Sequence, residues 1–158
     1  MDVASRQRSL VLEDPRYDLG RARFSPDQKW IAFNASNAPD AAVIFIAPFR
    51  GFSPIPREQW IQVTKGEAVD AIPRWSPDGG LLYFVSYRDG YECLYTQRLE
   101  PATRKPIGEA THLKHLNGAR RSLSSVFGPW QEISVARDKV VFPLNERTGN
   151  IWMRERIP

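Results

Sequence analysis

The sequence predicts an all-β protein made of repeated four-stranded sheets, and three observations support this prediction. Thirteen prolines and ten glycines are scattered between short apolar runs, as in chains with many turns. The apolar runs are short and nearly continuous, which is typical of strands buried on both faces of a sheet. One motif also occurs twice, because Arg23–Gln28 (RFSPDQ) and Arg74–Gly79 (RWSPDG) lie 51 residues apart.

Each copy of the motif opens a set of four expected strands, which we name A, B, C and D in chain order. Strand A carries the repeated aromatic residue, Phe24 or Trp75. The runs expected to form strands B, C and D are 30–33, 43–47 and 60–63 in the first copy and 81–85, 93–96 and 111–113 in the second. The Ser-Pro-Asp turns should join A to B tightly, because proline fixes φ at the turn corner. Asp89-Gly90 likewise predicts a hairpin turn between B and C.

A third, weaker copy ends the chain, with strands A, B and C expected at 133–136, 140–142 and 151–153. It has no strand D. At the other end, Leu12 precedes Phe24 by twelve residues, just as Val63 precedes Trp75. Residues 9–14 are therefore expected to form strand D of a closing sheet. The chain 1–158 is one segment, with sheets expected over 20–66, 70–116 and 130–157.

These repeats predict a β-propeller with three four-stranded blades per chain. Propellers typically have about four to eight blades, and three blades alone would expose more apolar sheet surface than a monomer usually carries. Two arrangements complete a six-bladed ring. A homodimer could form in which strand 9–14 of each chain completes the partner's last blade, or a longer chain could supply three more blades from its N-terminal half. We expect this chain to be half of such a ring.

Composition and charge narrow the classes of function. With 42% hydrophobic and 25% charged residues among 158, the chain resembles an ordinary folded domain. The net charge is +4, but basic and acidic residues alternate along the chain, so we expect no nucleic-acid partner. No apolar run approaches the roughly 20 residues that span a bilayer, and residues 1–8 resemble no signal peptide. We expect no membrane association and a cytoplasmic location as written, or a periplasmic or other extracytoplasmic one for a piece of a longer protein.

Residues that could carry catalysis or hold a metal have simpler structural explanations. His112 and His115 are the only histidines, and no cysteine or glutamate cluster accompanies them at metal-ligand spacing, so we expect no metal site. Cys93, the only cysteine, is expected to be a small buried residue. Asp27 and Asp78 should make structural hydrogen bonds within their turns. No Gly-x-Ser-x-Gly motif is present from which a hydrolase triad could be built, so we expect neither enzymatic activity nor a cofactor.

The binding candidates lie where a propeller exposes its central channel. Strand A lines the channel in this fold, which places Arg23 and Arg74 at the channel mouth. Loops from D to A add Asp70 in one repeat and Arg120 and Arg121 in the next, where the loop is about ten residues longer than its counterparts. Arginines in such a loop could bind a carboxylate or phosphate through two parallel hydrogen bonds. A flexible basic loop is the simpler alternative.

The second copy carries a family resemblance through Pro73–Gly79, Leu82–Phe84, Asp89-Gly90 and Leu94-Tyr95. These residues resemble the repeat of TolB-like (WD-repeat-like) six-bladed β-propellers, of which the chain would be the C-terminal half. The resemblance covers essentially the whole chain, although Ala136-Arg-Asp138 replaces Ser-Pro-Asp in the third copy. It implies a binding platform, for example the sensory or scaffold part of a bacterial signalling protein.

The sequence therefore predicts a non-catalytic module that binds a protein or peptide at the channel face. One alternative is the accessory propeller of a prolyl-oligopeptidase-like serine peptidase, whose hydrolase domain would lie elsewhere in the parent protein. Another is a periplasmic envelope protein of the TolB type, which needs an upstream signal peptide. One fold hosts many functions, so the residues of the site must decide.

Overall fold

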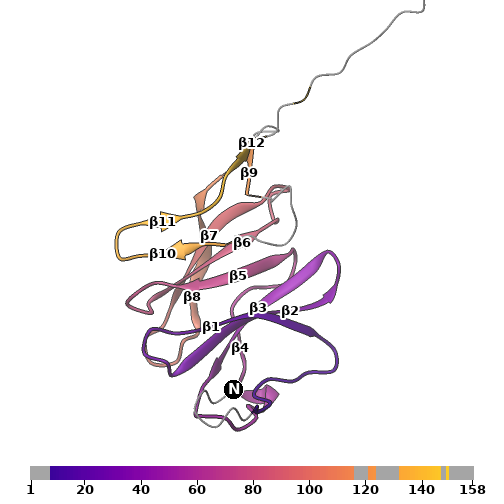
Figure 1. The fold of residues 1–158 in the computed structure, drawn as a ribbon, viewed down its shortest axis with the longest axis vertical. Helices are drawn as coiled ribbons and strands as arrows, with labels where there is room; N and C mark the ends of the chain where they lie inside the picture. Colours follow the sequence, from indigo (N-terminus) through magenta and orange to yellow (C-terminus); the bar gives the residue numbers. More distant parts are fainter. Residues whose placement is uncertain (1–7, 116–120, 124–131, 147–148, 150–158) are drawn as a thin grey trace, which may run out of the picture.

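The computed structural model describes residues 8–115, 121–123, 132–146 and 149. Two four-stranded antiparallel sheets follow one another along the long axis of the molecule, and two small strand pairs complete it (Figure 1). Within these residues the one helical element is a short 3-10 turn at Arg57–Gln59. The expected all-β class and the four-stranded antiparallel sheets are confirmed.

Both large sheets have their strands in chain order, as the A-to-D repeats predicted. The first sheet contains β1 (Asp18–Phe24), β2 (Trp30–Ala38), β3 (Ala41–Pro48) and β4 (Ile61–Gln62). The second contains β5 (Asp70–Trp75), β6 (Leu81–Ser86), β7 (Cys93–Leu99) and β8 (Pro106–Lys114). Each expected B and C run lies inside its strand, whereas β4 is shorter than the run at 60–63 because the 3-10 turn precedes it.

The two Ser-Pro-Asp turns have the same hydrogen bonds. The Ser25 hydroxyl donates to Asp27, and the Ser76 hydroxyl donates to Asp78. In each turn the backbone N–H two residues after the aspartate donates to the same carboxylate, at 3.2 Å and 3.0 Å. The serine hydrogen bonds hold the pKa of both carboxyl groups below its usual value. This geometry is the structural role expected for both aspartates.

The first strand of each sheet contains a β-bulge that the sequence did not reveal. Arg21 in β1 has a φ of 54°, and Ile72 at the matching position of β5 has a φ of 60°. The pairing register shifts immediately after these residues, before Arg23 and before Arg74. A bulge bends the strand and re-aims the side chains beside it, so the repeated bulge sets the directions of these two arginines.

The middle strands of each large sheet, β2 and β3 in the first and β6 and β7 in the second, are buried on both faces. One hydrophobic core lies between the two sheets. Along each strand, the side chains that point into this core alternate with side chains that point to the opposite face of the sheet, as in any β-strand. This central core contains Ala32, Ile44, Ile46 and Val63 from the first sheet and Trp75, Leu82, Phe84, Cys93, Tyr95 and Leu99 from the second. The far face of the second sheet packs against the third copy through Ile72, Val85, Leu94, Leu123 and Ile133.

The third copy is only partly described. Its expected strands A and B are present as β10 (Ser134–Val135) and β11 (Val140–Val141), which pair with each other. The expected strand C at 151–153 lies outside the described residues. An additional pair, which the repeat did not predict, joins β9 (Arg121–Ser122) to β12 (Asn145–Glu146).

Residues 9–14 do not form a strand in this chain. The Ile55 N–H donates to the Val11 carbonyl at 2.8 Å, and Val11 and Leu12 pack on the outer face of the first sheet. Asp14 is buried and pairs with two arginines. A strand needs a neighbouring edge to satisfy its backbone groups, and the described residues of one chain bring no such edge to this segment. Its pairing with the last blade of another half stays a prediction.

Candidate functional site

The site is built on the first strands of the three copies, which lie next to one another. The indole N–H of Trp75, in β5, donates to the carbonyl of Arg23, in β1, at 3.1 Å. The Arg74 Nε donates to the carbonyl of Ile133, which precedes β10, at 2.8 Å. The first of these bonds joins β1 to β5. The second joins β5 to the third copy.

Two of the predicted binding residues, Arg23 and Arg74, meet around the carboxylate of Glu132. Arg23 Nη2 lies 3.2 Å from Glu132 Oε1, and Arg74 Nη2 donates to Glu132 Oε2. The hydrogen bond from Arg74 holds the pKa of Glu132 below its usual value. The Arg74 side chain is 10% exposed and contacts Ile133 and Glu132 of the third copy. The Arg23 side chain is 44% exposed. Arg23 is therefore the member of this pair that an external ligand can reach.

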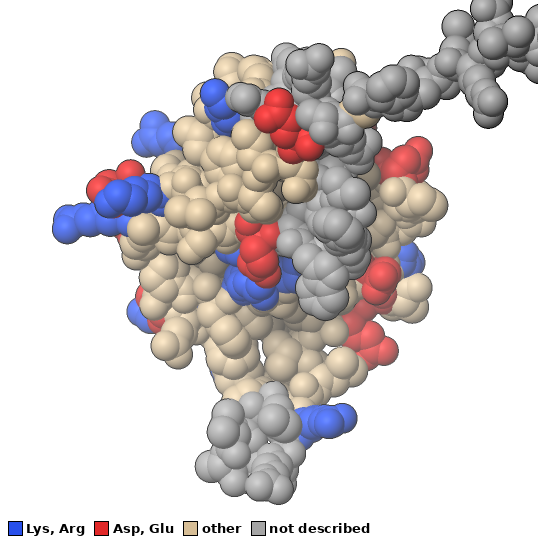
Figure 2. Space-filling view, turned by 45° about the horizontal axis from the view of Figure 1, so that its top comes forward, with Lys and Arg blue, Asp and Glu red and all other residues tan. Residues whose placement is uncertain are grey.

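A hollow of about 520 Å³ opens beside this ion pair. Phe24, which is 54% exposed, gives it an apolar wall next to the Arg23 guanidinium. The other lining residues are Pro26, Arg74, Trp75, Pro77, Glu132, Ile133, Ser134 and Val135. On the face in Figure 2, basic and acidic side chains lie in small separate groups, one of them near the centre, and neither sign forms a broad patch among the described residues. The hollow can take a ligand with one acidic and one apolar group.

Asp70 lies away from these arginines. It begins β5, four residues before Arg74, and is buried with its carboxylate 3.1 Å from Arg88 Nη2. It faces a second hollow of about 390 Å³ between the two sheets, which Lys65 and Glu109 bridge at 3.2 Å. Asp70 and Arg74 lie toward opposite ends of β5. The structure therefore does not bring Asp70 to the place where Arg23 and Arg74 meet.

The remaining predicted pair is only partly described. Arg120 lies outside the described residues. Arg121 belongs to β9, where its backbone pairs with Glu146. Their role as an anion-binding pair stays a prediction.

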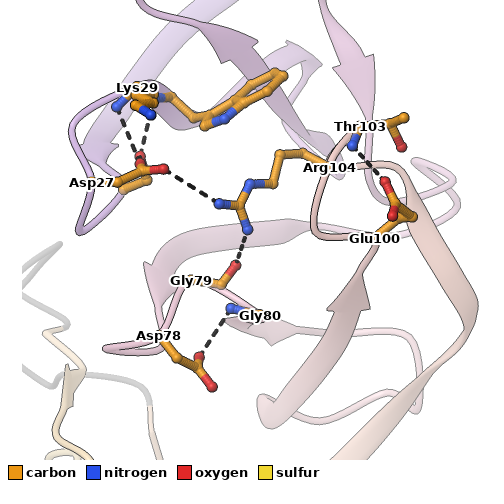
Figure 3. A network of polar contacts seen from close by, with 10 residues as sticks. Asp27, Lys29, Asp78, Gly79, Gly80, Glu100, Thr103 and Arg104 are labelled. Carbon is orange, nitrogen blue, oxygen red and sulfur yellow. Dashed lines mark hydrogen bonds and ion pairs between the residues drawn. The ribbon is translucent and has the colours of Figure 1, made fainter.

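A buried arginine that the sequence did not single out joins the two Ser-Pro-Asp turns (Figure 3). Arg104, in the turn between β7 and β8, donates from Nη1 to the Gly79 carbonyl at 2.7 Å and lies 3.5 Å from Asp27. The Glu100 carboxylate accepts from the Thr103 N–H and so stabilises the turn that carries this arginine. Because its side chain is 11% exposed, Arg104 is a structural clamp between the sheets.

Comparison with known proteins finds similar solved structures. No family model and no curated protein sequence matches the chain. Its structure is similar to the crystal structure of a puromycin hydrolase mutant complexed with PGG, with a TM-score of 0.61 and 18% sequence identity. That protein contains a β-propeller, a fold related to the one expected for this chain. The match covers 84% of this chain but 20% of that protein, so this chain spans about a fifth of the hydrolase's length.

Arg23 lies on β1, the first strand of its sheet, and Arg74 lies on β5, the first strand of the next sheet. Glu132 and Arg104 escaped the sequence analysis because neither occurs in the repeated motif. The pairing of Glu132 becomes visible only when the third copy packs against β5. Arg23 and Arg74 each precede a repeated aromatic residue, so the sequence identifies both of them, but only the structure shows that Arg23 is the exposed one.

One group of metal-ligating side chains converges among the described residues: Asp89, Cys93 and His115. No cysteine or glutamate cluster stands at metal-ligand spacing beside the histidines in the sequence, but the pairing of β7 with β8 brings Cys93 next to His115. His112 lies on β8, the last strand of the second sheet, and His115 follows it directly. In the part of the chain that the structure describes, no helix has the length and apolarity that crossing a bilayer requires.

Proposed function

We propose that this chain is half of a six-bladed TolB-like β-propeller that serves as a non-catalytic platform for a protein or peptide partner. Two blade-like sheets with adjacent inner strands, the beginning of a third, and the likeness to a propeller-containing structure support this proposal. The other three blades come from a second copy or from the rest of a longer chain. In the completed ring the inner strands line the channel, with Arg23 at its mouth.

The observation that carries the proposal is the carboxylate of Glu132 held between Arg23 and Arg74. This contact supports the binding of a partner carboxylate at Arg23, because an arginine presents N–H groups that match a carboxylate. The exposed Arg23–Glu132 pair contributes little to stability. A partner carboxylate can therefore replace it at Arg23 while Arg74 keeps Glu132, and Phe24 provides an adjacent apolar contact.

The proposal is tested with a fluorescent peptide that carries two glutamates beside a phenylalanine, titrated with the protein while anisotropy is recorded. The wild-type protein binds this peptide and binds its glutamine counterpart at least tenfold more weakly. Arg23→Ala weakens binding of the acidic peptide by about tenfold or more, because a charge-assisted hydrogen bond contributes about 1.5–3 kcal/mol. Glu132→Gln strengthens binding, since it removes the competing carboxylate.

The matched control is Arg98→Ala, because Arg98 is an exposed arginine on β7, away from the hollow. It should bind the acidic peptide as the wild-type protein does. Equal affinity of the wild-type and Arg23→Ala proteins, or equal affinity for the acidic and neutral peptides, contradicts the assignment of the site.

A second function is favoured by the structural match to a hydrolase. The chain could be part of an accessory propeller that restricts access to a prolyl-oligopeptidase-like catalytic domain in the same parent protein. The sequence of the parent gene decides between the two. A flanking hydrolase segment with a Gly-x-Ser-x-Gly motif supports the peptidase, and a flanking kinase or DNA-binding segment supports the signalling platform.

A further inference from the structure

We propose that Asp89, Cys93 and His115 form a zinc-binding site at one end of the β7–β8 strand pair. Asp89 lies in the turn between β6 and β7, Cys93 begins β7, and His115 follows β8 directly. Leu94 pairs with Lys114, so Cys93 and His115 are next to each other at the end of the same strand pair. The register of two strands thus assembles ligands that are 22 residues apart in the chain.

A bulge in β8 directs the histidines. Tyr95 pairs with His112 and Leu94 with Lys114, which leaves Leu113 as an extra residue on β8. Side chains three positions apart on a regular strand point to opposite faces, but the extra residue brings both imidazole rings to the same side. The ring centroids of His112 and His115 are 4.0 Å apart. The irregularity therefore turns His115 toward Cys93.

The distances between the ligand atoms fit a tetrahedral zinc ion. Cys93 Sγ lies 3.6 Å from His115 Nδ1, and His115 Nδ1 lies 3.4 Å from Asp89 Oδ2. All three ligand atoms lie within 4.8 Å of one another. Zinc bonds of about 2.0–2.3 Å at tetrahedral angles place ligand atoms about 3.3–3.6 Å apart. The Cys93–His115 and His115–Asp89 separations already match this range. A small rotation of the Asp89 side chain brings the Cys93–Asp89 separation into it.

A catalytic cysteine triad does not explain this geometry. In a triad the carboxylate and the nucleophile bind opposite nitrogens of the histidine, whereas here Cys93 and Asp89 both approach Nδ1. One ring nitrogen carries at most one proton, so it can donate to only one of them. Cys93 is also fully buried. A cation at the point where the three atoms converge can be bound by all three of them.

The surroundings of the cluster support a metal site. The Tyr95 hydroxyl donates to Asp89 Oδ2 and orients the carboxylate, as outer-shell partners of metal ligands do. The positive charge of the nearby Arg88 is paired with Asp70. Asp89 and His115 are 40% and 35% exposed, so an ion can enter from solvent, and water fills the fourth position. Binding converts the Cys93 thiol to a thiolate and releases its proton to solvent.

The proposal is tested on the full chain after treatment with a chelator, using zinc alone and then cobalt alone as probes. Calorimetry should show one zinc ion bound per chain, and cobalt should give a thiolate-to-cobalt charge-transfer band. Cys93→Ser should abolish that band. His115→Gln, at a half-exposed position that the fold tolerates, should weaken zinc binding at least tenfold, and Asp89→Asn should weaken it to a smaller extent.

Glu109→Gln is the control, because Glu109 is an exposed carboxylate on β8 outside the cluster. It should bind zinc with wild-type affinity. Circular dichroism confirms that each variant is folded. The proposal is overturned by the lack of a thiolate band in the wild-type protein, or by zinc binding that His115→Gln leaves unchanged.

Discussion

Gln28 and Gly79 occupy equivalent places in the two Ser-Pro-Asp turns, and both have positive φ, 58° and 72°. A side chain in this left-handed region costs free energy, because its Cβ approaches the following carbonyl oxygen, whereas glycine adopts the same backbone without that cost. Both positions keep the same turn hydrogen bond, in which their N–H donates to the serine carbonyl at 2.9 Å. The second copy therefore has the residue that suits the turn, and the first copy does not.

Gln28→Gly is predicted to raise the free energy of unfolding by up to about 1 kcal/mol, because it removes the strain at an exposed position. The reverse change, Gly79→Ala, should lower it by about 1 kcal/mol or more. Its Cβ would lie 3.4 Å from Arg104 Nη1, which adds little steric cost beyond the φ strain. Urea titration measures both changes. A loss of stability in Gln28→Gly would mean that the glutamine side chain makes a stabilising contact.

At the scale of strands, the elements that were predicted well are those that the hydrophobic pattern alone defines. β2, β3, β6 and β7 are continuous apolar runs that must be buried on both faces, so the sequence places them closely. The bulges at Arg21 and Ile72 were missed because neither position has the glycine that usually marks positive φ. The strand expected at 9–14 was inferred from its distance along the chain to Phe24. Such a distance does not show which strand edge is available for pairing.

The same reasoning explains what was predictable in the sites. Arg23 and Arg74 precede a repeated residue, so comparing the copies was enough to find them. Glu132 comes from a copy whose motif has diverged, and its contact with Arg74 depends on how that copy packs. The Cys93–His115 contact depends on an extra residue in β8, which changes the strand register without leaving a signal in the sequence.

The N-terminal segment provides a test at the scale of one element. Removing residues 1–12 should convert a paired form of the chain into monomer, because those residues are proposed to complete the partner's last blade. Asp14 must be kept, since its carboxylate pairs with Arg16 and Arg57 within the first sheet. Sedimentation velocity compares the truncated and full chains. An unchanged dimer after the truncation would rule out strand exchange through this segment.

For the whole molecule, the question is what covers the two ends of the stack of sheets. At the first sheet, Leu10 and Phe52 are each more than half exposed, and Phe52 lies against Phe49. In the third copy, Val141 is 65% exposed. Apolar residues at both ends of a stack of blades are what an interrupted ring leaves uncovered, and burying them favours association.

The central claim, that this chain is half of a ring, is tested most directly by its mass in solution. Sedimentation equilibrium of the isolated full chain at micromolar concentration should give about 36 kDa, twice the 18.1 kDa of one chain. A mass of 18.1 kDa at every concentration would contradict completion of the ring by a second copy, because the apolar ends of the stack would then stay in water without a partner chain.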